Sequence, residues 1–148
     1  MTRVGATLAL IAVASVACAA AAGSGSAAAS TPHHYTQFES PSRNIGCTLL
    51  GGLARCDILA RSWSPPQRPA SCPHIVDFGQ GLMVATRGAA RFVCAGDTAA
   101  DPRAPILPYG QIDIVGALQC SSAFAGMTCR SSRTGHGFFI SRQRYSIF

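Results

Sequence analysis

The sequence predicts an all-β fold, a small disulfide-stapled sandwich or partly open barrel of about eight short antiparallel strands. Hydrophobic runs in the body of the chain are short and bounded by Gly, Pro and Ser, and none keeps a helical period for three turns. Four cysteines form two identical C-x8-C spacings. Six cysteines remain once Cys18, in an apolar leader, is set aside, and this even number allows three disulfides, as in small exported proteins.

Residues 1–22 are predicted to be a secretory signal peptide. Arg3 gives a positive start, Val4 to Ala17 is apolar, and a tract of small residues follows. The apolar run is shorter than the ~20 residues that a membrane span needs. The residues around Cys18 partly resemble a bacterial lipobox, so lipid attachment at Cys18 is an alternative to free secretion. We expect contact with a membrane only if Cys18 is lipidated.

Residues 23–34 are predicted to be a flexible linker, because they are mostly small or polar and have no hydrophobic pattern. Residues 35–148 then form a single disulfide-bonded β domain, as their length suggests. No hydrophobic run of membrane length occurs in this part of the chain. The expected location is outside the cytoplasm, secreted or in the cell envelope.

The clearest element is a β-hairpin from Ile45 to Ile58. A two-residue Gly51-Gly52 turn suits the positive φ angles of a type I′ hairpin and places Cys47 opposite Cys56. Cross-strand partners lie close enough for a disulfide. One face of this hairpin is predicted to be buried, and it carries Ile45, Cys47, Leu49, Ala54, Cys56 and Ile58.

The second C-x8-C segment, Cys120 to Cys129, predicts another disulfide-linked hairpin, here with a four-residue loop and Gly126 in the left-handed region. Cys72 and Cys94 remain as the third pair and enclose two strands around an Arg87-Gly88 turn. Residues 111–118 predict a further hairpin that turns at Gly116. Two proline-rich stretches are expected to be loops, because proline is excluded from central strands; they are residues 63–69 and 101–108.

The chain also resembles a known family. The cysteine framework, with Leu107-Pro108-Tyr109-Gly110 and Gly135-His136-Gly137-Phe138, is similar to a family of short exported actinobacterial, often mycobacterial, proteins of unknown function. The similarity spans nearly the whole domain. It implies a secreted or envelope-associated protein, and it supplies no substrate, cofactor or catalytic residue.

Three residues are candidates for ligand binding. Trp63 and Tyr109 each lie in or beside a proline-rich loop and are candidates for an aromatic platform for a glycan or peptide, or else they plug the rim of a small core. His136 lies between glycines, where its ring is either presented to a ligand or used to hold a turn. No catalytic residue, metal site or cofactor is expected, because no nucleophile motif occurs and C-x8-C is wider than zinc spacings.

The net charge of the chain limits the classes of partner that we expect it to bind. The chain has 12 basic residues, all arginine, against 6 acidic ones, and its formal net charge is +6. This favours an anionic envelope polymer, or another exported protein, as partner. The arginines are scattered and form no stripe with aromatics, so nucleic acid is not expected. The predicted function is a non-enzymatic binding module; the alternative is a small secreted hydrolase or an inhibitor of one.

Overall fold

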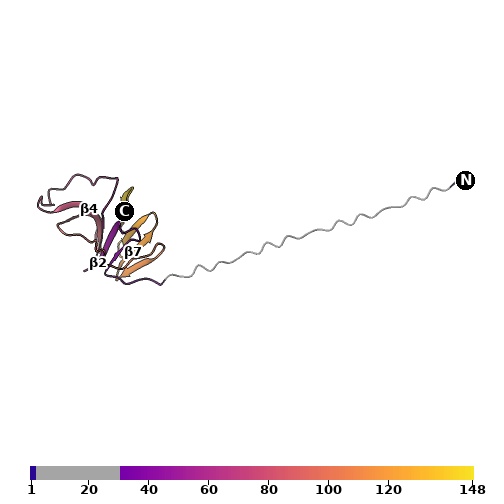
Figure 1. The fold of residues 1–148 in the computed structure, drawn as a ribbon, viewed down its shortest axis with the longest axis horizontal. Coiled ribbons are helices and arrows are strands. Elements are labelled where there is room, and N and C mark those ends of the chain that lie inside the picture. Colours follow the sequence, from indigo (N-terminus) through magenta and orange to yellow (C-terminus); the bar gives the residue numbers. More distant parts are fainter. Residues whose placement is uncertain (3–30) are drawn as a thin grey trace.

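The computed structural model describes residues 1–2 and 31–148, so Cys18 and nearly all of the predicted signal peptide lie outside the described part. The described residues form ten strands and no helix, arranged as two layers (Figure 1). In chain order the strands are β1 Gln37–Glu39, β2 Ile45–Leu50, β3 Leu53–Ile58, β4 Asp77–Ala85, β5 Arg91–Ala95, β6 Ile112–Val115, β7 Leu118–Ala123, β8 Gly126–Ser131, β9 Gly137–Ile140 and β10 Tyr145–Ile147.

Each layer is an antiparallel five-stranded sheet, in which every strand pairs with its neighbours along the chain. One sheet has the order β1-β2-β3-β4-β5 and the other β10-β9-β8-β7-β6. The predicted all-β fold is therefore confirmed as a sandwich, because the described strands form two separate sheets that are not closed into a barrel. Two three-residue strands at sheet edges, β1 and β10, help to raise the total above the eight expected.

The first hairpin has the predicted register. Gly51 and Gly52 form its turn with φ angles of 62° and 78°, and Leu50 pairs with Leu53. Cys47 pairs with Cys56 across the ladder and forms a disulfide with it. All six residues of the predicted inner face are at most 5 % exposed.

The loop prediction for the second hairpin was wrong. Ala123 pairs with Gly126, so the turn has only two residues, Phe124 and Ala125. Gly126 lies against strand β9, where a Cβ atom would come 2.5 Å from the carbonyl oxygen of Ile140. The glycine is therefore needed for this close approach, and not for a longer loop.

The two hairpin disulfides meet in the centre of the sandwich. Cys120 is bonded to Cys129, and the sulfur of Cys129 lies 3.4 Å from that of Cys56 in the other sheet. Large apolar side chains surround this sulfur cluster: Phe38, Leu49, Leu82, Leu107, Leu118, Met127, Phe138 and Ile140. The chain-entropy model gives about 2.7 kcal/mol for each of these short disulfide loops, so the fold depends on them.

Ordered contacts begin earlier than the predicted linker end at residue 34. His33 forms a parallel bridge with Asp113, donating to Ile112 O and accepting from Ile114 N, both at 2.9 Å. The edge of β6 has unpaired backbone groups that take up this segment. The Tyr35 backbone N also donates to Asp113 Oδ1 at 2.6 Å.

Candidate functional site

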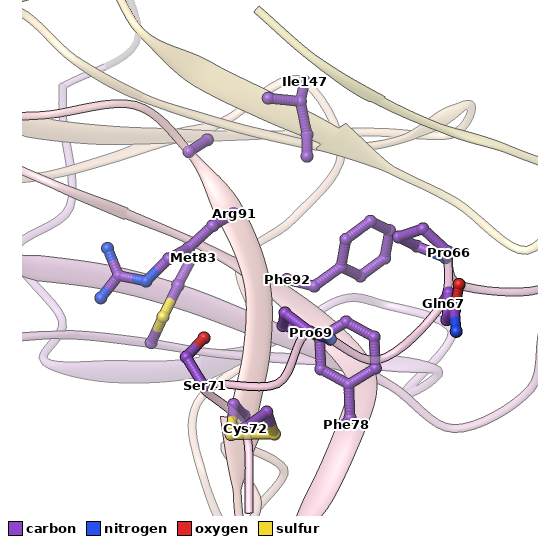
Figure 2. Close-up of a pocket in the computed structure, with 12 residues that line it drawn as sticks. Pro66, Gln67, Pro69, Ser71, Cys72, Phe78, Met83, Arg91, Phe92 and Ile147 are labelled. Carbon is purple, nitrogen blue, oxygen red and sulfur yellow. A yellow bond between two sulfur atoms is a disulfide. The ribbon is translucent and has the colours of Figure 1, made fainter.

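A hollow lies where the edge strands of the two sheets, β5 and β10, come together at one lip of the sandwich. This lip groove has a volume of about 660 Å³ (Figure 2). It runs past the free edge of β5, so that Phe92 lies on one side of the strand while Met83 and Arg91 lie on the other. Its wall is mainly apolar and is made by Pro66, Pro69, Phe78, Met83, Phe92 and Ile147.

The proline-rich loop, residues 63–72, forms the outer wall of the lip groove. Its three prolines restrict the backbone, and the Cys72–Cys94 disulfide ties the end of the loop to β5. Arg68 fixes the loop from within, because its guanidinium donates to the carbonyl oxygens of Pro73 and Val76, both at 2.8 Å. The wall is therefore a rigid segment, suited to a preformed binding site.

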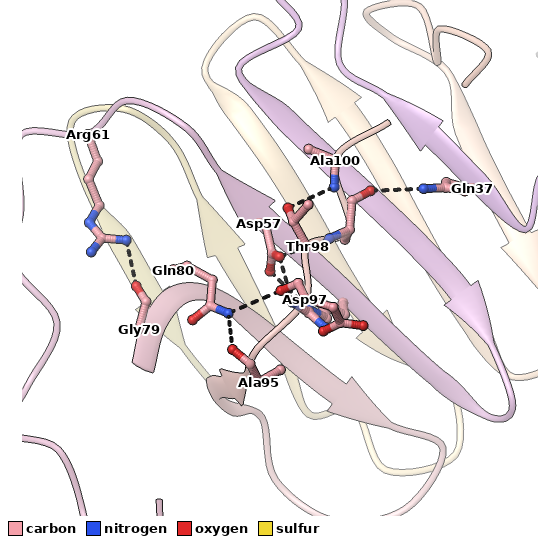
Figure 3. Close-up of polar contacts among 11 residues, drawn as sticks. Gln37, Asp57, Arg61, Gly79, Gln80, Ala95, Asp97, Thr98 and Ala100 are labelled. Atoms are coloured by element: carbon pink, nitrogen blue, oxygen red, sulfur yellow. Dashed lines mark hydrogen bonds and ion pairs between the residues drawn. The ribbon is translucent and has the colours of Figure 1, made fainter. Parts of the chain in front are cut away.

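A bulge in β4 shapes the floor of the groove. The register of β4 against β5 shifts between Phe78 and Leu82. Gly79, inside the bulge, has a φ angle of 81°, and a Cβ atom there would come 2.5 Å from the Pro65 side chain. Arg61 donates to the carbonyl oxygen of Gly79 (Figure 3). The bulge thus lets the proline-rich loop come close and turns the Phe78 ring toward Phe92, 5.9 Å away between centroids.

One residue of the lip groove, Arg91, carries a positive charge. The lining of the groove also includes Gln67 and Ser71, and no aspartate or glutamate. Arg91 makes no ion pair with any residue in the described part of the chain. The groove thus has aromatic side chains on one side of the β5 edge and one available cation on the other, and can hold a molecule whose apolar body and acidic group lie across that edge.

Trp63 lies behind the wall of the lip groove, against Phe92 and Tyr145. It is half-buried, and its Nε1 donates to Ser141 O at 2.8 Å. Its ring packs on Tyr145 at 4.7 Å and on Phe92 at 6.3 Å, while the Arg61 guanidinium lies 4.6 Å from it. Trp63 thus supports the groove wall through Phe92.

Tyr109 lies in a second hollow at one end of the sandwich. It is 41 % exposed, and its ring meets that of Phe124 edge-to-face at 5.7 Å. Both rings line a cleft of about 510 Å³ that we call the end cleft. Four connections wall it: the β1–β2 connection, the β5–β6 connection that carries Tyr109, the β7–β8 turn and the β9–β10 connection.

His136 lies apart from both hollows. It is exposed in the β8–β9 connection, at the opposite end of β8 from Phe124. Its backbone N donates to Thr134 Oγ1 at 3.2 Å, and its carbonyl oxygen accepts from Ser131 N at 2.9 Å. No hydrogen bond joins its ring to another described residue. The structure therefore does not bring Trp63, Tyr109 and His136 into one site.

In residues 1–2 and 31–148, one group of three potential metal-ligating side chains lies close together. The sulfur atoms of Cys47, Cys56 and Cys129 lie within 4.8 Å of one another. All three belong to disulfides, whereas zinc is held by thiolates. In the oxidised protein this cluster is the sulfur core of the sandwich.

An ion-pair network braces the outer face of the first sheet (Figure 3). Arg55 Nη2 lies 2.7 Å from Asp57 Oδ2, and its Nη1 lies 2.7 Å from Asp97 Oδ1. Asp57 Oδ2 also accepts from the backbone N of Ala99 at 2.9 Å. The hydrogen bond from Arg55 lowers the pKa of Asp97. These contacts hold the segment after β5 against β3, which is a structural role.

The lip groove was missed at the level of sequence. Phe78, Phe92 and Ile147 are far apart along the chain and share no spacing. The one signal that could have pointed to it is the proline-rich loop, with the Cys72–Cys94 pair that ties it to a strand.

Comparisons with known proteins give a family but no activity. The model of a family of unknown function, DUF6636, matches residues 9–148. No curated protein and no solved structure matches the chain. In residues 1–2 and 31–148 we find no helical segment with the length and hydropathy of a membrane span. The three intramolecular disulfides indicate an oxidising, extracytoplasmic environment. The chain belongs to the DUF6636 family of unknown function.

Proposed function

We propose that this protein is a non-enzymatic, extracytoplasmic binding module whose lip groove takes an amphipathic anion, such as a long-chain carboxylate. The apolar part of the ligand packs on Phe78, Phe92 and Ile147, and its acidic group pairs with Arg91. This refines the expectation of an anionic partner, because the proposed ligand carries both an acid and an apolar body.

The observation that carries the proposal is the pairing of an apolar hollow with an available cation. A volume of about 660 Å³ lies in the usual range of small-molecule sites, about 300–1,000 Å³. Burying an apolar chain is worth about 0.8 kcal/mol per methylene group. A charge-assisted hydrogen bond from Arg91 would fix the orientation of such a chain.

The chain organisation proposed with this function follows from the sequence. Residues 1–22 direct export and are removed, residues 23–34 link, and residues 35–148 bind. Free secretion is preferred, and lipidation at Cys18 would place the groove at a membrane surface. Mass spectrometry of the protein from its host separates the two: cleavage between Cys18 and Ser30 supports secretion, and an acylated N-terminal Cys18 supports the anchor.

The alternative, a small secreted hydrolase or an inhibitor of one, would need a reactive constellation around His136. The ring of His136 is exposed and has no hydrogen-bonded carboxylate among the described residues. Since no contact of His136 points to catalysis, we propose the binding function.

Trp63 provides the test, because it is the one tryptophan in the chain and packs on Phe92 in the groove wall. We expect 12-bromododecanoate, titrated below its critical micelle concentration, to quench Trp63 fluorescence with saturation. Arg91→Gln should weaken binding about tenfold, and Ile147→Ser should also weaken it.

Matched control variants remove an arginine and an isoleucine at exposed positions outside the lip groove. Arg133→Gln removes an exposed arginine and Ile75→Ser an isoleucine that is 93 % exposed; neither should change the affinity. Dodecyltrimethylammonium tests the charge preference. Equal binding of this cation, or loss of affinity in the controls as large as in the groove variants, would contradict the proposal.

A further inference from the structure

The end cleft is independent of the lip groove and has a different chemistry. It opens where the inner face of β7 runs beyond the packed core, so that Leu118 and Cys120 lie inside and Ser122 lies at the cleft. Its lining is more polar than that of the lip groove, with serines, Asn44, Arg142 and Gln143 around the hollow.

Ser122 is the unusual residue of the cleft. It is 2 % exposed, and its hydroxyl has no hydrogen-bond partner among the described residues. Its backbone is fully used, because its N donates to Gln111 O at 3.0 Å and its carbonyl oxygen accepts from Gly110 N at 2.8 Å. An unpaired buried hydroxyl costs about 1–3 kcal/mol, and a ligand in the cleft could give it a partner.

Two aromatic rings stand at the mouth of the cleft. Phe124 is 90 % exposed at the tip of the β7–β8 turn, and Tyr109 meets it edge-to-face. An exposed phenylalanine in a tight turn adds nothing to the core. Aromatic ring faces are electron-rich, so they attract the weakly positive C–H groups on the face of a sugar ring.

Some polar side chains of the cleft rim are hydrogen-bonded within the protein, and others are available for a ligand. Asn44 is used within the fold, since its side chain exchanges hydrogen bonds with the backbone of Ala60 at 3.0 and 2.8 Å. The side chains of Arg142 and Gln143 make no hydrogen bond with any described residue. The backbone of Arg142 is held, because its carbonyl oxygen accepts from Ser62 N at 2.8 Å.

We propose that the end cleft is a carbohydrate-binding site for a pyranose ring that carries a carboxylate. Phe124 and Tyr109 supply the stacking surface, Ser122 a hydroxyl partner, and Arg142 a cation for the acid. No other residue of the cleft lining is charged, which leaves Arg142 to set the preference for acidic sugars.

The test is an amide NMR titration of the folded domain with tetragalacturonate, a chain of acidic pyranoses. We expect saturable shifts at Ser42, Tyr109, Phe124 and Arg142, with weaker or no response to neutral maltotetraose. Phe124→Ser and Arg142→Gln should each weaken binding about tenfold, and Ser122→Ala about fivefold.

Ser122→Ala separates binding from folding. Because the hydroxyl is unpaired, its removal should leave the melting temperature unchanged or raise it, while affinity falls. Arg133→Gln and Ile75→Ser, both at exposed positions, should bind like the parent protein. The shifts expected here lie in the end cleft and not in the lip groove. A negative result would therefore contradict the carbohydrate site and leave the proposed function of the lip groove unaffected.

Three results would overturn the carbohydrate site. They are the absence of shifts at millimolar tetragalacturonate, equally tight binding of maltotetraose, and equally tight binding of a tetraglutamate peptide. The last result would indicate a site for acidic peptides instead.

Discussion

Replacing Asp57 by alanine should destabilise the domain more than any change to a surface ion pair. Asp57 is 2 % exposed and accepts two hydrogen bonds from Arg55, at 3.0 and 2.7 Å, and one from Ala99 N at 2.9 Å. Without it, the Arg55 guanidinium stays buried with its remaining partner, Asp97, on the exposed side.

The magnitude follows from this burial. Removing one partner of a buried ion pair costs about 3–5 kcal/mol, because the other charge is left uncompensated. At roughly 4 °C per kcal/mol for a domain of this size, the melting temperature should fall by about 12–20 °C. Asp97→Ala should lose much less, since the Asp97 side chain is 79 % exposed and its pair is screened by water.

The double variant Arg55→Met/Asp57→Leu provides the sharper comparison. It removes both charges, so most of the loss should be recovered. A cost of about 1–2 kcal/mol should remain, because Ala99 N loses its acceptor. Urea unfolding followed by Trp63 fluorescence and far-UV circular dichroism, with the disulfides intact, measures all variants. A single-variant loss below about 1 kcal/mol, or a double variant no more stable than Asp57→Ala, would refute the reasoning.

Three further predictions concern stability. Burial raises the pKa of Asp113 above 3.8, so the native state keeps a proton that the unfolded chain has lost, and stability should fall as pH rises from about 4 through the native pKa. Asp113→Asn should reduce that fall in thermal melts between pH 4 and 7. Part of the fall should remain, because burial also raises the pKa of Glu39. An unchanged dependence of stability on pH in Asp113→Asn would contradict a raised pKa of Asp113. Cys120→Ser/Cys129→Ser should cost about 2–5 kcal/mol in urea unfolding, and one air-stable free thiol in the mature domain would contradict the three-disulfide framework. Gly81→Ala should prevent normal folding, because a Cβ there would overlap the carbonyl oxygen of Cys56 in strand β3; a melting temperature near that of the parent would refute this.

The hairpins could be predicted because their information is local. Gly51-Gly52 sets a two-residue turn, and the turn sets which residues face each other, so Cys47 and Cys56 follow. The turn of the second hairpin was predicted wrongly, because Gly126 allows a close contact with Ile140 of strand β9 and with Ser141 just after it, which no local pattern reveals.

The sites could not be predicted because they arise from tertiary packing. The lip groove depends on a bulge in β4 and on two sheet edges that meet, and neither leaves a motif. Tyr109 was identified as a candidate, yet its neighbour Phe124 lies in the turn that was expected to be longer. The burial of Asp113 depends on the His33–Tyr35 segment, which the sequence assigns largely to the linker.

The most direct test of the proposed function is an isotope-filtered NOE experiment on the mature domain with uniformly ¹³C-labelled dodecanoate. Our account predicts NOEs from the acyl methylenes to Phe78, Phe92 and Ile147, and shifts of the Arg91 side chain on binding. NOEs to Tyr109 and Phe124 instead, or saturable binding without any NOE to the lip groove, would contradict it.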